Sequence, residues 1–210
     1  AYNYYITTDF ATSENQSADF SVISVWAYNA QGDWFWVDGV CERQTMDKSV
    51  NDLFRLVQIY TPMSVGVEIT GQQGAFIKWL QQEMLSRNIW FNFASSDNKS
   101  NTPGIRPIIN KLTRFNLVVP LFKAGKMYFP AEMKASKIMG HFYGQIKLAT
   151  MNGLKGKDDC IDTISMLMYL NAWKPSEDQG KHPMIGHNGG PDWDEDERQD
   201  GVLAINSYIV

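Results

Sequence analysis

The sequence predicts an α/β fold in which helices cover both faces of a mixed five-stranded sheet, with strand order 3-2-1-4-5 and strand two antiparallel to its neighbours. Two observations predict it. Three strand-like segments follow one another through short loops, which makes them antiparallel neighbours. Helical and strand-like segments then alternate, and this alternation predicts parallel pairing of the last strands through right-handed crossovers.

The first three strands form a meander. Residues 2–8 and 20–28 are rich in aromatic and β-branched side chains, and the polar stretch 10–18 between them is typical of a loop. A tight turn at residues 30–33, Ala-Gln-Gly-Asp, leads into the third strand at residues 34–40.

The next part of the chain supplies two crossover helices. Apolar side chains at positions 50, 53, 54, 57 and 60 follow a candidate N-cap at Asp47, and Pro62 ends that helix. Residues 64–69 alternate as a fourth strand. A second helix begins at Gly71 and Gln72, and residues 89–93 form the fifth strand.

Helices dominate the remainder. We expect helices over about 103–119, 131–148 and 159–172, with a short edge strand at 126–129 and a loop at 151–157. Beyond Trp173 the composition shifts to proline, glycine and acids. The prediction is therefore one domain at residues 1–173 and an acidic C-terminal tail at 174–210 that is peripheral or partly disordered.

The bulk composition suits a single globular domain, since 44% of the 210 residues are hydrophobic. No run of about 18 apolar residues predicts a membrane span, and the first residues alternate like a strand rather than a signal peptide. The missing initiator methionine indicates a piece of a longer protein. Cys41 and Cys160 fit a reducing compartment and are predicted to be small buried side chains.

The net charge of -4 hides an uneven distribution. Residues 99–157 contain eleven basic side chains and one acid, Glu132, whereas residues 174–210 contain three basic and eight acidic ones. The basic segment is either a solvated surface or a face that binds DNA phosphates. On the second interpretation the candidate DNA contacts are Arg106, Lys111, Arg114, Lys123, Lys126, Lys155 and Lys157.

Carboxylates from three distant stretches are the candidate catalytic groups. Asp9 follows the first strand, where an acid is also a common turn former. Glu68 lies within a short apolar strand, where either a salt bridge or an edge position would account for it. Asp158, Asp159 and Asp162 begin the last helix near one face, where acids also complement the helix dipole.

If these acids meet at one end of the sheet, their mutual repulsion requires neutralisation. Oxygen ligands without cysteine or histidine suit Mg²⁺ or Mn²⁺, and two such ions would promote hydrolysis of a phosphodiester. We therefore expect Asp9, Glu68, Asp158, Asp159 and Asp162 to supply the metal ligands, with catalysis assigned to Asp9, Glu68 and Asp162. Asp9, as the most rigidly held acid, would bridge the two ions. Asp159 remains an alternative to Asp162.

At these residues the chain resembles the C-terminal nuclease domain of the large terminase subunit of tailed bacteriophages. The similarity covers most of residues 2–173 in the order and approximate spacing of that family. The segments that carry it are 7–11 (Thr-Thr-Asp-Phe-Ala), 18–23 (Ala-Asp-Phe-Ser-Val-Ile), 67–68 (Val-Glu), 111–115 (Lys-Leu-Thr-Arg-Phe), 125–130 (Gly-Lys-Met-Tyr-Phe-Pro) and 158–163 (Asp-Asp-Cys-Ile-Asp-Thr).

The resemblance implies a ribonuclease H-like fold and metal-dependent cutting of concatemeric double-stranded phage DNA during genome packaging. It also implies partners: the packaging ATPase region of the same polypeptide, the portal and the small terminase subunit, in the bacterial host cytoplasm and transiently at the procapsid portal. No Gly-x-x-x-x-Gly-Lys-Ser/Thr loop occurs in this sequence. Translocation is therefore not expected of this segment alone.

Two other functions fit the same residues. One is a different ribonuclease H-like nuclease, such as a junction resolvase or an exonuclease, because the acids alone do not separate these. The other is a non-catalytic module that grips DNA in a packaging motor. Cutting of covalently closed plasmid, preference for four-way junctions, and metal-dependent activity discriminate among the three.

Overall fold

The computed structural model describes residues 1–11, 19–69, 74–96, 102–150, 153–154 and 156–176. Within these ranges no helix is long and apolar enough to cross a membrane. Of the expected acidic tail, only residues 174–176 are described, and residues 177–210 lie outside the described residues. Its expected structure therefore stays a prediction.

The predicted mixed sheet is confirmed. Strand β1 (Tyr2–Asp9) lies between β2 (Ser21–Asn29), to which it is antiparallel, and β4 (Ser64–Val67), to which it is parallel. Strand β3 (Trp34–Glu42) follows β2 in antiparallel pairing. The predicted short edge strand is β5 (Met127–Tyr128), which pairs in parallel with β3.

The position beyond β4 belongs to residues 89–93, as the order 3-2-1-4-5 requires. Their pairing is limited to a parallel bridge between Val65 and Phe93. Val65 N donates to Asn92 O at 2.7 Å, and Ala94 N donates to Val65 O at 2.8 Å. The expected fifth strand is therefore present as a short bridged segment rather than as a continuous ladder.

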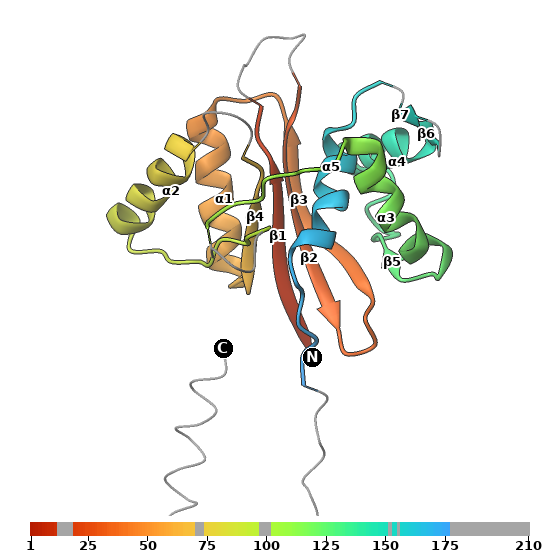
Figure 1. Cartoon of the computed structure of the whole chain (residues 1–210), viewed down its shortest axis with the longest axis horizontal. Helices are drawn as coiled ribbons and strands as arrows, with labels where there is room; N and C mark the ends of the chain where they lie inside the picture. The colour runs from red at the N-terminus through yellow and green to blue at the C-terminus, as the bar shows by residue number, and fades with distance from the viewer. Residues whose placement is uncertain (12–18, 70–73, 97–101, 151–152, 155, 177–210) are drawn as a thin grey trace, which may run out of the picture. The chain divides into compact units, whose positions relative to one another are not determined.

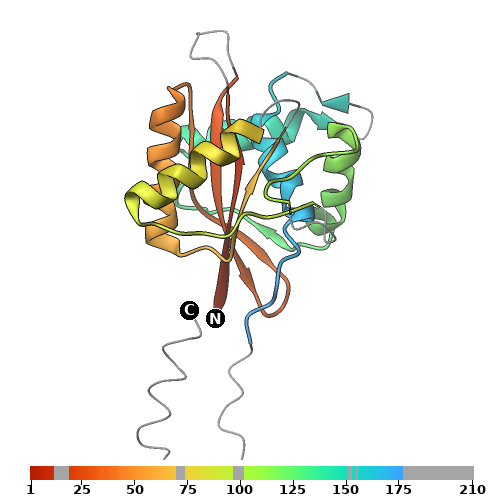
Figure 2. The ribbon, with the colours of Figure 1, turned by 60° about the vertical axis from the view of Figure 1, so that its left-hand side comes forward.

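Helices cover the two faces of the sheet (Figures 1 and 2). One face carries α1 (Met46–Tyr60) and α2 (Gly74–Arg87), and the other carries α3 (Lys111–Lys123), α4 (Lys137–Leu148) and α5 (Asp159–Ser165). Alternation along β1 divides the core accordingly, because Tyr5 packs in the cluster with α3, α4 and α5 while Ile6 packs in the cluster with α1 and α2.

The start of α1 differs from the prediction by two residues. Thr45, not Asp47, is the N-cap, and its side chain accepts a hydrogen bond from Lys48 N at 3.2 Å. Asp47 lies in the first turn, where its charge complements the helix dipole. The helix ends at Tyr60 with Thr61 in a left-handed conformation, just before Pro62.

The helix expected at 103–119 is wrong in its first part, since α3 begins only at Lys111. Gly104 has a φ of +91°, and Ile105 hydrogen-bonds along β4, with Ile105 N donating to Val67 O at 2.8 Å. The apolar spacing that predicted a helix includes Ile108, which is 96% exposed. Residues 102–110 instead form an extended connection that crosses the sheet to α3 (Figures 1 and 2).

The last two predicted helices are also shorter than expected. Residues 131–136 form turns before Ser136 caps α4. After Ser165, α5 gives way to a 3₁₀ helix, η1 (Met166–Tyr169). A two-stranded pairing of β6 (Ala149–Thr150) with β7 (Gly153–Leu154), which the sequence did not predict, joins α4 to α5.

Candidate active site

Asp9 and Glu68 lie at the same end of neighbouring parallel strands. In the β1–β4 ladder Thr8 is paired with Val67, so the next residue on each strand is one of these two acids. Side chains in one register of a parallel pair point to the same face. Here it is the face covered by α3 and α5, because Gly66, two residues before Glu68, lies against Met166 of η1.

Gly66 allows the chain that follows α5 to approach β4 closely. A Cβ at this position would lie 2.7 Å from Met166 Sδ and 3.1 Å from Ile105 Cδ1 and Leu170 Cδ2. The missing side chain therefore lets η1, and with it α5, pack directly on the strand that carries Glu68.

Helix α5 brings the other acids to the same place and is held by buried hydrogen bonds. Asp159 Oδ2 accepts from Phe20 N at 3.2 Å, and Cys160 N donates to Gln145 Oε1 at 2.8 Å. Asp158 is the N-cap residue, but its side chain forms no capping hydrogen bond. Gln145 of α4 therefore satisfies an amide at the start of α5.

The two cysteines also join α5 to the sheet. Cys41 on β3 and Cys160 on α5 are buried free thiols, as predicted, and their sulfurs are 3.9 Å apart. The contact with Cys41, and after it burial, raise the pKa of the Cys160 thiol, which keeps it protonated. The two thiols therefore contribute to the packing of α5 against β3.

The acids influence one another electrostatically. Burial raises the pKa of Asp9 well above its ordinary value, and the carboxylates of Asp162, Asp159 and Glu68 raise it further, in that order. Within the described part of the chain no hydrogen bond or ion pair reaches the Asp9 carboxylate. Burial likewise raises the pKa of Asp162 to about 6 and that of Asp159 above its ordinary value.

Two basic side chains of α3 are paired with these acids. Arg114 is buried, and its Nη1 lies 2.9 Å from Glu68 Oε2 while its Nη2 lies 3.3 Å from Asp162 Oδ1. Lys111 contacts Asp162 Oδ2 and lies 3.1 Å from Asp158 Oδ1. The expected DNA contact at Arg114 therefore requires revision, because a buried, paired guanidinium is not accessible to a phosphate.

The site fits a hard divalent cation, because the only atoms that its acids offer as metal ligands are carboxylate oxygens. These acids are Asp9, Glu68, Asp159 and Asp162. The described residues nevertheless contain no group of three acidic, histidine or cysteine side chains already gathered as a metal cage. Lys111 and Arg114 contact oxygens of Asp162 and Glu68, so an ion bound there would have to displace or share these contacts.

The other predicted DNA contacts are distributed unevenly. Arg106 follows Ile105, which bridges to Glu68, and is exposed, whereas Lys123 lies at the opposite end of α3 from Lys111. Lys126 pairs with Asp33 at 2.8 Å in the β2–β3 turn. Asp33 lies near Asn29, which pairs with Tyr2 at the start of β1, so Lys126 is at the end of the sheet remote from Asp9.

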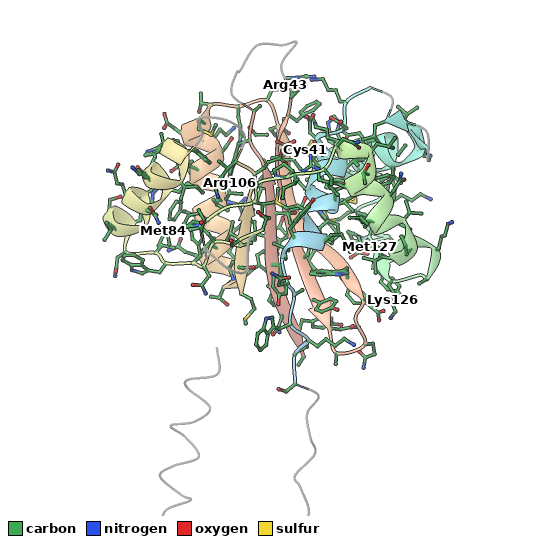
Figure 3. The ribbon with its side chains drawn as sticks, in the orientation of Figure 1. Cys41, Arg43, Met84, Arg106, Lys126 and Met127 are labelled. Atoms are coloured by element: carbon green, nitrogen blue, oxygen red, sulfur yellow. The ribbon has the colours of Figure 1, made fainter. Side chains whose placement is uncertain are left out.

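Figure 3 shows the same separation: Lys126 is labelled at one end of the sheet and Arg43 at the other, beyond Cys41. Lys157 lies beside α5, 3.1 Å from Asp19, and Lys155 lies outside the described residues. The predicted basic face is therefore not one continuous set around the acids.

Sequence reasoning missed a cluster around Phe20 at the Asp159 side of the site. The guanidinium of Arg43 lies 4.2 Å from the centre of the Phe20 ring, and Lys157 Nζ lies 5.3 Å from it. His141 also contacts the ring at 4.6 Å, and burial lowers its pKa, which favours the neutral imidazole. No local pattern marks Arg43, because its stacking partner is more than twenty positions away.

Comparisons with known proteins found similarity in structure but none in sequence. No protein-family model and no curated protein sequence matches this chain. Among solved structures, the human cytomegalovirus terminase nuclease domain superimposes with a TM-score of 0.55 at 14% identity, covering 81% of this chain and 83% of that one. This chain has the fold of a terminase nuclease domain.

A second solved structure also superimposes on this chain. The large terminase nuclease of thermophilic phage G20c, solved with bound magnesium, gives a TM-score of 0.50 at 17% identity and covers 79% of each chain. The expected ribonuclease H-like architecture is thus confirmed, with the terminase-nuclease arrangement of sheet and helices. At these identities the likeness is one of fold.

Proposed function

We propose that this chain is a metal-dependent DNA endonuclease that cuts concatemeric phage DNA during genome packaging, with little sequence specificity. The observation that carries the proposal is the convergence of Asp9, Glu68, Asp159 and Asp162 from three remote segments onto one end of a terminase-nuclease fold. Several partly buried acids at one end of a sheet repel one another, which is costly to a fold that gains nothing from them.

The solved neighbours support the choice of ions. The cytomegalovirus domain was solved after soaking in manganese, and the phage G20c nuclease with bound magnesium. We propose that two Mg²⁺ or Mn²⁺ ions bind between Asp9, Glu68 and Asp162. When bound, such ions supply an activated water and stabilise the attacking and leaving oxygens of a phosphodiester.

The residues of this chain have separate tasks in the proposal. Asp9 ends a central strand, next to Glu68 on the neighbouring strand, and these two acids would hold the ions from the sheet side. Arg114 contacts both Glu68 and Asp162, so these two carboxylates lie beside each other, and we assign Asp162 as the ligand from α5 and Asp159 as its supporting neighbour. The Asp158 side chain is 24% exposed, against 2% for Asp162, and we treat Asp158 as the weakest candidate.

The packaging partners follow from the same proposal. A nuclease of this class would act on double-stranded DNA together with the packaging ATPase region of the same polypeptide, the portal and the small terminase subunit, in the bacterial host. We propose these partners from the terminase-nuclease fold.

The test uses covalently closed plasmid with Mn²⁺ or Mg²⁺, with and without a chelator. We expect nicked and linear products only in the presence of the ions. Degradation that requires free ends would identify an exonuclease, and preferential cutting of a four-way junction would identify a resolvase. Binding of DNA with no cutting under any ion would leave the non-catalytic gripping module as the function.

Arg43 and Lys157 are expected to hold DNA at the Asp159 side of the site. Stacking on Phe20 orients the guanidinium of Arg43 at little entropic cost. Replacing both residues with alanine should weaken DNA binding about tenfold at low salt and reduce the salt dependence by roughly 1–2 phosphate contacts. Fluorescence anisotropy with a duplex at several salt concentrations measures both effects.

The matched control is Lys48→Ala, an exposed lysine on α1, which covers the opposite face of the sheet. Its DNA affinity should remain close to wild type. Equal losses for this control and the double variant would mean that the effect is one of net charge and that the Phe20 cluster has no special part in binding.

A further inference from the structure

Arg114 is an almost fully buried cation with two carboxylate partners. It is 2% exposed, and its two terminal nitrogens contact Glu68 and Asp162, which come from β4 and α5. Its Nε is buried and has no hydrogen-bond partner among the described residues. A guanidinium in this position cannot move into solvent without opening the interface between α3, β4 and α5.

Lys111 lies one turn earlier on the same helix and has a different environment. It contacts the second oxygen of Asp162 as well as Asp158, and its side chain is 48% exposed. The two oxygens of Asp162 are thus each in contact with a different cation, Oδ1 with Arg114 and Oδ2 with Lys111. A half-exposed, flexible ammonium is able to leave, whereas the buried, planar guanidinium is not.

We propose that Lys111 is an exchangeable counter-ion which yields Asp162 Oδ2 to a divalent cation, while Arg114 is a fixed positioning residue that keeps Glu68 and Asp162 aligned with or without the ion. This inference rests on the proposed metal site. It accounts for the unequal partners of Asp162, whose Oδ1 contacts the buried guanidinium and whose Oδ2 contacts the half-exposed ammonium.

The two roles predict opposite effects on metal binding. Removing Lys111 removes a competitor, so Lys111→Met should bind Mn²⁺ about tenfold more tightly than wild type, as expected for loss of one charge-assisted hydrogen bond. Lys111→Arg retains the charge and should stay close to wild type. Removing Arg114 separates the ligands, so Arg114→Met should bind Mn²⁺ more weakly and lower the melting temperature of the metal-free protein by roughly 10 °C.

Isothermal titration calorimetry with MnCl₂ on the metal-free chain measures the affinities, and thermal unfolding measures the stability. The control is Lys123→Met, which removes a lysine from the far end of the same helix and should leave the affinity unchanged. If Lys123→Met tightens binding as much as Lys111→Met, the effect is one of net charge and the exchange is refuted.

The outcomes keep the two proposals apart. If wild type and all variants bind no Mn²⁺, the metal-dependent function itself fails. If wild type binds Mn²⁺ but Lys111→Met binds no more tightly, only the counter-ion exchange fails. Tighter binding by Arg114→Met than by Lys111→Met would reverse the assigned roles. Should Arg114→Met fail to fold, the comparison of Lys111→Met with Lys111→Arg still decides whether Lys111 competes with the ion.

Discussion

Replacing Asp9 with asparagine is expected to abolish plasmid cutting, with a loss of about three orders of magnitude or more. A neutral amide would hold a divalent cation much less tightly than a carboxylate, and a loss of roughly 4 kcal/mol of transition-state stabilisation corresponds to such a decrease. The substitution at Asp9 breaks no ion pair, because none reaches its carboxylate within the described ranges. Initial rates of plasmid nicking in Mn²⁺ provide the measurement.

Folding is the control for this prediction. Asp9→Asn removes one of several mutually repelling carboxylates, so its melting temperature should equal or exceed that of wild type. Asp47→Asn, an exposed acid in the first turn of α1, should retain wild-type cutting. Glu68→Gln should also be inactive, although it additionally removes a charge partner of Arg114. Near-wild-type rates in Asp9→Asn and Glu68→Gln together would refute the assignment of the site.

The metal-free protein is expected to become less stable as the pH rises from about 4 to 6. The pKa of Asp162 is raised to about 6 in the folded state, from an ordinary value of 3.8, so within this window the folded protein binds a proton that the unfolded chain has lost. Rising pH removes that proton, and the free energy of unfolding decreases by about 3 kcal/mol, or roughly 6–12 °C in melting temperature. The raised pKa values of Asp9 and Asp159 act in the same direction.

Thermal unfolding in chelator at pH 4.5 and pH 7.0 measures this change, and Asp162→Asn isolates its source. The variant cannot ionise at this position, so the difference between its two melting temperatures should be smaller than in wild type. Mn²⁺ added at pH 7.0 should restore stability to wild type, because it binds the ionised acids only in the folded state. An identical pH response in wild type and Asp162→Asn would show that Asp162 is not the titrating group.

Local patterns were sufficient for the sheet but less so for the later helices. The three strands of the meander and β4 are rich in β-branched and aromatic side chains, many of them buried, and their order followed from short loops and crossover rules. The segment before α3 misled the prediction because Ile105, Ile108 and Ile109 have helical spacing. The positive φ of Gly104 and the backbone pairing of Ile105 beside β4 keep this segment extended in spite of that spacing.

The sequence alone determined which chemical groups are available: acids at positions 9, 68 and 158–162 on elements whose order brings their ends together. The tertiary structure decided how they are used. It placed Asp162 beside Glu68, left Asp158 partly exposed, and turned Arg114 from an expected DNA contact into a buried partner of Glu68 and Asp162. The reason is physical: the burial and charge of a side chain depend on neighbours that are 46 and 48 positions away in the chain, and local patterns carry no information about them.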